Sequence, residues 1–141
     1  MPIIHFHLVE GQSTPAQEEH LLKKSSAFYA EILQCPIERV RAFIQTYPSR
    51  RCAVAGALVG NDKGQAPYFE FLVLEGRPLD QRQRLLNGFT DLLVETLGVD
   101  RTFIRGHCKR VQPEEWSIGG VPASDLRKKD IQTFTKVDSS S

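Results

Sequence analysis

The 141-residue sequence contains few cysteines and no pair of them at a zinc-binding spacing. Cys35, Cys52 and Cys108 are three in number, and none belongs to a C-x-x-C pair, so neither a complete disulfide framework nor a zinc site is indicated. No run approaches the roughly 20 apolar residues of a membrane span, and the start lacks the cationic leader and apolar stretch of a signal peptide. We therefore expect a cytoplasmic protein.

The sequence also lacks an excess of charge of either sign. Lys+Arg 18 against Asp+Glu 17 gives a net charge of +1, so no global field would draw the protein to nucleic acid or to an anionic membrane. Short basic patches such as Arg127-Lys128-Lys129, which Asp130 follows, are interpreted as solvated surface. With 40% hydrophobic and 25% charged residues, the composition is that of one ordinary folded domain.

What the sequence does contain is an internal repeat. Ile3–Gly11 matches Tyr68–Gly76 at an offset of 65 positions, and a proline, Pro2 or Pro67, precedes each segment. Both segments are rich in apolar and β-forming residues and end at Glu-Gly, which predicts a buried strand followed by a turn.

A helix is predicted after each of these strands. Ser13 or Thr14 is the expected cap of the first helix, with Pro15 in its first turn, and Asp80 is the expected cap of the second. The two apolar stripes have the 3.6-residue spacing of an amphipathic helix and repeat at an offset of 64: Leu21, Leu22, Phe28, Tyr29, Ile32 and Leu33, then Leu85, Leu86, Leu92, Leu93, Thr96 and Leu97.

A second strand is predicted after each helix, around residues 40–44 and 103–107. Strands joined through a helix should run parallel, by a right-handed crossover. We therefore predict an α/β fold in which tandem β-α-β repeats, about residues 2–58 and 67–120, form a four-stranded sheet with two helices on one face. Residues 1–134 form the expected single domain, and residues 135–141 are expected to be a disordered tail.

These features together resemble the 4-oxalocrotonate tautomerase superfamily over nearly the whole chain. The resemblance rests on the Met1-Pro2 start, the strands ending in Glu-Gly, the arginines Arg41 and Arg105 in the second strands, and the terminal Trp-Ser-Ile-Gly-Gly-Val-Pro-Ala-Ser from Trp116. Fused members of that family carry two units per chain and assemble as trimers. The resemblance thus implies a homotrimer that binds a small carboxylate-bearing substrate and needs no metal or organic cofactor.

The family's catalytic base is an amino-terminal proline, which falls on Pro2. Its secondary amine is a base only after Met1 is removed, and an apolar pocket would lower the amine's pKa towards neutrality. The family's carboxylate-binding arginine after Glu-Gly falls on Arg77, whereas the first repeat has Gln12 there. Because Pro67 is internal, the resemblance implies one active site per chain, shared between the two repeats.

The resemblance assigns supporting roles to further residues. Arg41 and Arg105 occupy the second-strand position that binds substrate or stabilises an enolate-like oxygen, and Arg41 is slightly favoured to face Pro2. Trp116 would wall the pocket against water, and Glu115, next to Glu114, is a candidate for orienting a water. His5 and His7 share one strand face but lack a third ligand, so they are interpreted as strand residues rather than metal ligands.

The predicted function is tautomerisation of small 2-oxo or 2-hydroxy-dienoate acids. Two alternatives stay open: decarboxylase or hydratase/dehalogenase chemistry on a small 3-oxo or haloacrylic acid, and a non-catalytic ferredoxin-like ligand-binding module. Residues 36–51 and Arg77-Pro78 are also similar to malonate semialdehyde decarboxylase. That enzyme, however, has an aspartate about where Arg39 stands here and a second arginine where Leu79 stands.

Overall fold

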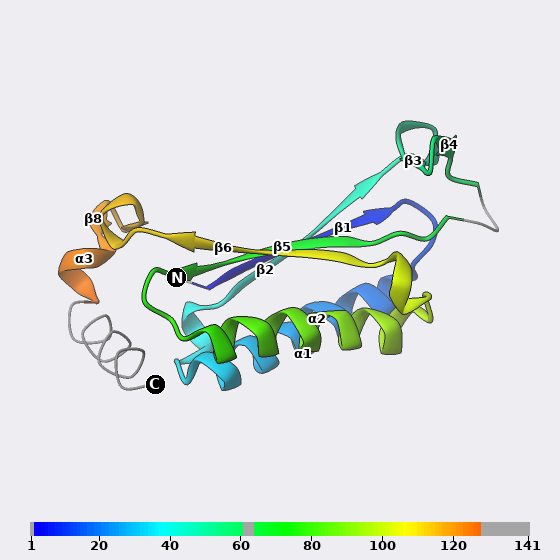
Figure 1. The fold of residues 1–141 in the computed structure, drawn as a ribbon. Coiled ribbons are helices and arrows are strands. Elements are labelled where there is room, and N and C mark those ends of the chain that lie inside the picture. The colour runs from blue at the N-terminus through cyan, green and yellow to red at the C-terminus, as the bar shows by residue number, and fades with distance from the viewer. Residues whose placement is uncertain (1, 61–63, 128–141) are drawn as a thin grey trace.

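The computed structural model describes residues 2–60 and 64–127, and it contains the β-α-β unit twice (Figure 1). In each half a short 3-10 turn connects the helix to the second strand. The first half consists of β1 (Ile3–Val9), α1 (Pro15–Leu33), η1 (Ile37–Arg39) and β2 (Arg41–Tyr47). The second consists of β5 (Tyr68–Leu74), α2 (Leu79–Leu97), η3 (Arg101–Phe103) and β6 (Arg105–Val111).

The four long strands form one sheet in the order β2-β1-β5-β6. Within each half the strands are parallel, and the halves join where β1 runs antiparallel to β5. Both helices cover the same face of the sheet (Figure 1), which confirms the predicted α/β fold. The second strands begin later than predicted, at Arg41 and Arg105, because the residues before them form the 3-10 turns.

The two helices begin differently. At α1, Thr14 and Gln17 form a capping box: the Gln17 amide donates to Thr14 Oγ1 at 3.1 Å, and the Thr14 amide donates to Gln17 Oε1 at 2.9 Å. At α2 the cap is Pro78, so the prediction of Asp80 was wrong. The connection before α2 is one residue shorter than that before α1, which leaves Asp80 inside the first turn, where its carboxylate still complements the helix dipole.

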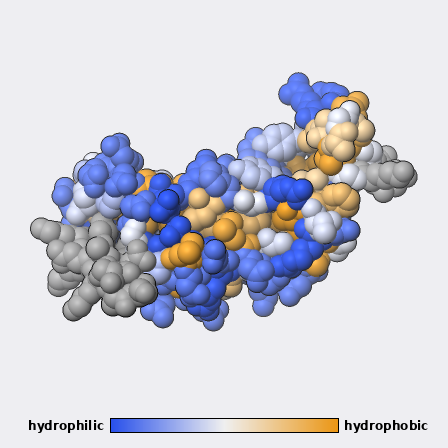
Figure 2. Space-filling model, viewed as in Figure 1, coloured by the Kyte–Doolittle hydropathy of each residue, from blue (hydrophilic) through white to orange (hydrophobic). Residues whose placement is uncertain are grey.

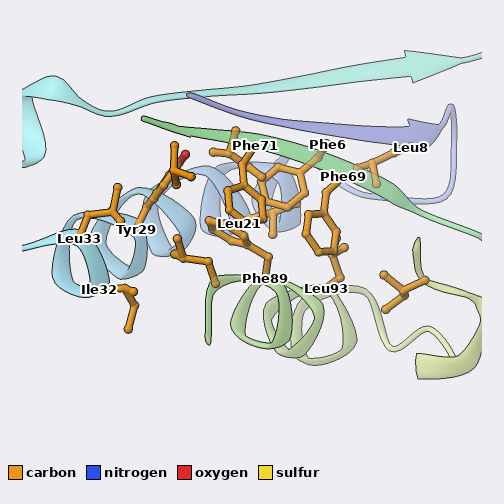
Figure 3. Packing of buried hydrophobic residues seen from close by; sticks show 14 of the residues in the cluster. Phe6, Leu8, Leu21, Tyr29, Ile32, Leu33, Phe69, Phe71, Phe89 and Leu93 are labelled. Carbon is orange, nitrogen blue, oxygen red and sulfur yellow. The ribbon is translucent and has the colours of Figure 1, made fainter. Parts of the chain in front are cut away.

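The core lies between the sheet and the helices and is rich in aromatic rings (Figure 3). Phe89 of α2 is fully buried at its centre, with ring centroids 5.1 Å from Phe71, 5.3 Å from Tyr29 and 5.7 Å from Phe69, all in edge-to-face geometry. Such pairs contribute about 0.5–1.5 kcal/mol each beyond the area that they bury. Packing across the two repeats therefore makes them one hydrophobic core.

Two glycines allow this packing. A Cβ atom added at Gly88 of α2 would lie 1.9 Å from Phe28 Cζ, and one added at Gly106 of β6 would lie 2.1 Å from Phe69 Cζ. Gly88 thus lets the Phe28 ring of α1 lie against α2, and Gly106 makes room for a core ring under the edge strand.

Short hairpins follow β2 and β6 and project at opposite ends of the sheet (Figure 1). They are β3 (Ala53–Val54) with β4 (Ala57–Leu58), preceded by η2 (Ser49–Arg51), and β7 (Ser117–Ile118) with β8 (Val121–Pro122), preceded by η4 (Pro113–Glu115). The second is followed by a covering helix, α3 (Ala123–Leu126), and the described residues after the first form no such helix. On the first, Leu58 is 69% exposed, and apolar atoms show on this arm in Figure 2.

No helix in the described part of the chain is both long and apolar enough to cross a membrane. The tail predicted for residues 135–141 lies outside the described residues.

Candidate active site

Pro2 is a buried residue at the start of β1. Its carbonyl accepts a hydrogen bond from the Arg41 amide at 2.9 Å, as the Pro67 carbonyl does from the Arg105 amide at 3.1 Å. The antiparallel ladder ends with Ile4 opposite Phe71, two residues from Pro2 and near the end of β5. Pairing of the two repeats therefore brings Pro2 next to the turn that connects β5 to α2.

Arg77 lies in that turn, at the same end of the sheet as Pro2. Gly76 has a φ of +107°, and the Arg77 amide closes the turn on the Leu74 carbonyl at 3.3 Å. The half-buried guanidinium donates from Nη1 to the Leu33 carbonyl at 3.0 Å and to Gln81 Oε1 at 3.4 Å. A cation at the C-terminal end of α1 is favourable for the helix dipole. Arg77 thus contacts the end of α1, in addition to its predicted contact with a substrate carboxylate.

The opposite end of the sheet has a different set of side chains. There Gln17 donates to the Thr96 carbonyl at 3.0 Å, near the end of α2. A glutamine thus contacts the end of α2, whereas Arg77 contacts the end of α1 at the Pro2 end. A pocket lies against Pro67, and Gln12 is the residue of its lining that corresponds to Arg77. The remaining lining is largely apolar: Leu8, Val9, Ser13, Gln65, Ala66, Leu97 and Val99.

Trp116 also lies at the Pro2 end. It packs with Ile118 against a small buried cluster of Leu74, the last residue of β5, and Ala123 of α3. The hairpin is fixed to this helix by the Ala123 amide, which donates to the Trp116 carbonyl at 2.8 Å. Glu115, immediately before Trp116, is exposed in η4 together with Glu114.

Arg41 and Arg105 lie at opposite ends of the sheet. Arg41 pairs with Ile3 beside Pro2, whereas Arg105 pairs with Tyr68 beside Pro67. Seven-residue strands separate the two ends by about 20 Å. Of these two arginines, only Arg41 therefore lies near Pro2 of the same chain.

The arginine side chains are exposed and fold back in the same way. Arg41 Nη1 donates to the Glu38 carbonyl at 3.0 Å, and Arg105 Nη1 donates to the Thr102 carbonyl at 2.7 Å. Because Arg41 pairs with Ile3, its side chain projects from the open face of the sheet, and the helices cover the other face. The guanidinium of Arg41 is thus turned away from the core side of its own chain.

Comparison with known proteins decides the family. A sequence model described as "Tautomerase enzyme" matches residues 67–126. The 2-hydroxymuconate tautomerase of Comamonas testosteroni is 33% identical over 60 residues, which cover 43% of this chain and 95% of that protein. The chain belongs to the tautomerase superfamily. A further relative, the 2-hydroxymuconate tautomerase of Pseudomonas sp. (strain CF600), is 36% identical over 56 residues, or 40% of this chain and 87% of that protein.

Solved structures extend the likeness of this chain to both repeats. A fused 4-OT solved as a symmetric trimer is similar with a TM-score of 0.79 and 22% identity, covering 88% of this chain and 98% of that one. Native fused 4-OT gives a TM-score of 0.81 at 19% identity over 89% of this chain and 98% of that one. These identities are low, so the structures show a shared fold. The family and its named relatives support an isomerase-type enzyme.

The open face of the four-stranded sheet carries a polar network that the sequence did not predict. His7 Nδ1 lies 2.7 Å from the Tyr47 hydroxyl and His7 Nε2 lies 3.3 Å from Glu70 Oε1. The other carboxylate oxygen of Glu70 lies 3.1 Å from Lys109 Nζ and accepts from the Tyr68 hydroxyl at 3.3 Å. The network spans all four long strands. In the sequence its signal is a pair of polar residues two positions apart in each central strand, His5 and His7 in β1 and Tyr68 and Glu70 in β5.

The network changes the acidity of its members. The hydrogen bond from Lys109 lowers the pKa of Glu70, with burial opposing it and His7 adding to it. Burial and the neighbouring Glu70 carboxylate raise the pKa of Tyr68. Within residues 2–60 and 64–127, no group of three or more His, Cys, Asp or Glu side chains is placed to hold a metal ion.

Proposed function

We propose that this chain is a tautomerase of small 2-oxo or 2-hydroxy-dienoate acids, with the amino-terminal nitrogen of Pro2 as its general base. The observation that carries the proposal is the antiparallel pairing of β1 with β5, because it places Pro2 at the end of the sheet where Arg77 lies. Removal of Met1 makes the Pro2 nitrogen a secondary amine, which can take up a proton. The pairing therefore makes one site from two repeats.

The proton transfer needs few groups. The Pro2 amine removes a proton from the substrate, and the electrons move through the conjugated enol and carbonyl system. The same nitrogen then returns the proton to another carbon, so the acid is isomerised without net gain or loss of atoms. Burial of the Pro2 amine would disfavour its charged form and leave free base near neutral pH.

Arg77 would bind the substrate carboxylate. A guanidinium can hold a carboxylate through two parallel hydrogen bonds, which fixes orientation as well as charge. In the described structure Nη1 contacts the Leu33 carbonyl, which anchors the arginine at the end of α1. Trp116, packed beside Leu74, would shield this end from water.

A homotrimer would complete the site. Arg41 lies beside Pro2 but projects from the open face of the sheet, and Arg105 lies at the far end. An arginine that stabilises the developing enolate would therefore come from a neighbouring copy of the chain. The fused 4-OT trimers of the same fold support this assembly. A cytoplasmic location and an unstructured tail remain predictions.

The alternatives receive less support. Hydration, dehalogenation or decarboxylation would need an acid that orients water or polarises the substrate, and Glu115, the candidate for it, is exposed in η4. A ferredoxin-like module would have a split β-α-β unit, whereas here β1 pairs directly with β2 and β5 with β6.

Intact mass and a pair of proline variants test the proposal. The active preparation should lack Met1, and Pro2→Ala should lower kcat/KM for 2-hydroxymuconate or phenylenolpyruvate by about 100-fold or more, the usual contribution of a positioned base. Pro67→Ala is the matched control, since Pro67 begins the equivalent strand but has an amide nitrogen. Its rate should equal that of the wild type. A retained Met1, or equal rates for Pro2→Ala and wild type, would exclude Pro2 as the base.

A further inference from the structure

The two ends of the β1–β5 strand pair differ, although the repeats themselves match. The antiparallel ladder runs from Ile4–Phe71 to His7–Tyr68. By the 65-residue offset, the terminal pair His7–Tyr68 corresponds to Leu72–Ile3, but the ladder stops one pair short of these residues. At the Pro67 end the pairing thus includes Tyr68, the first residue of β5. At the Pro2 end it stops at Ile4 and leaves out Ile3, the first residue of β1.

The hydroxyl of Tyr29 lies at the point where the ladder stops. It donates to the Leu72 carbonyl and lies 3.5 Å from the Ile3 carbonyl. These are the two residues that would form the next pair. A buried side chain of α1 therefore bridges the backbone of both strands immediately after Pro2.

The corresponding residue of the other repeat is different. Tyr29 corresponds to Leu93 at the 64-residue offset, and both side chains are fully buried. Leucine has no hydroxyl that could contact the strand carbonyls. At the Pro67 end, β1 and β5 instead pair with each other, His7 with Tyr68. Tyr29, like Arg77, is therefore a residue of the Pro2 end that has no chemical equivalent at the Pro67 end.

The hydroxyl of Tyr29 is built into the core and stays protonated. Its ring packs edge-on against Phe71 and Phe89, with centroids at 5.8 and 5.3 Å. Burial raises the pKa of Tyr29 well above its ordinary value, and the nearby titratable groups, the thiols of Cys108 and Cys35, raise it further. The hydroxyl is thus a permanent donor over the pH range in which an amine base would work.

We propose that Tyr29 is a positioning residue for Pro2. Its hydroxyl donates to the Leu72 carbonyl and lies beside the Ile3 carbonyl, so it sets where β1 separates from β5 and fixes the Pro2 nitrogen relative to the turn that holds Arg77. This role rests on the proposed function of Pro2, and Tyr29 itself touches neither substrate nor the reacting atoms. A displacement of a reacting group by about 1 Å can cost about 100-fold in rate, so such a fixed point has a measurable effect.

Tyr29→Phe tests the proposal, because it removes the hydroxyl and keeps the ring in the core. Leu93→Val is the matched control, since it perturbs packing at the equivalent position of the other repeat. We expect Tyr29→Phe to lower kcat about 10- to 100-fold, to change KM less than twofold, and to move the midpoint of the pH–rate profile upward. Leu93→Val should lower the melting temperature and leave kcat, KM and the pH midpoint unchanged.

A second variant, Tyr29→Leu, reproduces the residue of the other repeat and should show the same loss of kcat. Wild-type kcat and pH midpoint in Tyr29→Phe, or equal losses in Tyr29→Phe and Leu93→Val, would overturn the positioning role. Pro2→Ala separates this failure from that of the proposed function. If Pro2→Ala keeps the wild-type rate, Pro2 is not the base. If Pro2→Ala loses activity while Tyr29→Phe has wild-type kinetics, the role of Tyr29 alone is rejected.

Discussion

Replacing Arg77 with glutamine makes the second repeat match the first, which has Gln12 at this position. A hydrogen bond to a charged group contributes about 1.5–3 kcal/mol. Since about 1.4 kcal/mol corresponds to a factor of ten, loss of the guanidinium should lower kcat/KM for a carboxylate substrate by about 10- to 150-fold. Most of the change should be a higher KM, because a carboxylate is bound in the ground state as well as in the transition state.

The same substitution has a smaller structural effect. Arg77 donates to the Leu33 carbonyl at 3.0 Å, and one such bond contributes about 1 kcal/mol. For a chain of this size that corresponds to a fall of about 2–6 °C in melting temperature. Steady-state kinetics and a thermal melt of Arg77→Gln measure the two effects separately.

The matched control is Gln12→Arg, which adds a guanidinium at the Pro67 end. Because Pro67 has no free amine, this variant should gain no activity. If Arg77→Gln melts at a lower temperature but keeps kcat/KM within twofold of wild type, Arg77 only stabilises the end of α1. The reasoning that places the carboxylate at Arg77 would then be refuted.

Two further predictions concern stability. Because contact with Lys109 lowers the pKa of Glu70, the ionised carboxylate stabilises the fold above about pH 5, and this stabilisation is lost as the pH falls through the lowered pKa. Glu70→Gln should thus cost about 1 kcal/mol at pH 7 and progressively less as the pH falls through the lowered pKa of Glu70, and denaturant titrations that show the same cost over the whole pH range would contradict this. Gly88→Ala should destabilise by about 1 kcal/mol in a thermal melt, since the clash with Phe28 exceeds the gain in helix propensity, and a higher melting temperature would show that the ring moves aside.

The sequence predicts the fold because the same pattern occurs twice. The first strands match at an offset of 65, and the helices and second strands match at 64. This repeat predicts two paired β-α-β units. The errors are local. Asp80 has the chemistry of a cap, but a connection one residue shorter moves the start of α2 to Leu79. The predicted second strands began one and two residues too early, at Val40, which caps the first 3-10 turn, and at Phe103, which ends the second.

The candidate site is less accessible to sequence reasoning because it depends on register. That Arg41 lies beside Pro2 while Arg105 lies at the far end follows only from the antiparallel pairing of the halves. The open-face network of His7 and Glu70 likewise needs two strands in one particular alignment. Tyr29 looks in sequence like any other member of an apolar stripe, and only its hydroxyl contacts distinguish it.

The pocket at Pro67 shows how the second end of the molecule differs from the first. The nitrogen of Pro67 is an amide, and Gln12 and Leu93 stand where Arg77 and Tyr29 stand at the other end. A circular permutant that began at Pro67 would carry its free amine among these residues. If Pro2 and Arg77 act as proposed, that permutant would have a base without a carboxylate partner, so a free amine alone would not create a second active site.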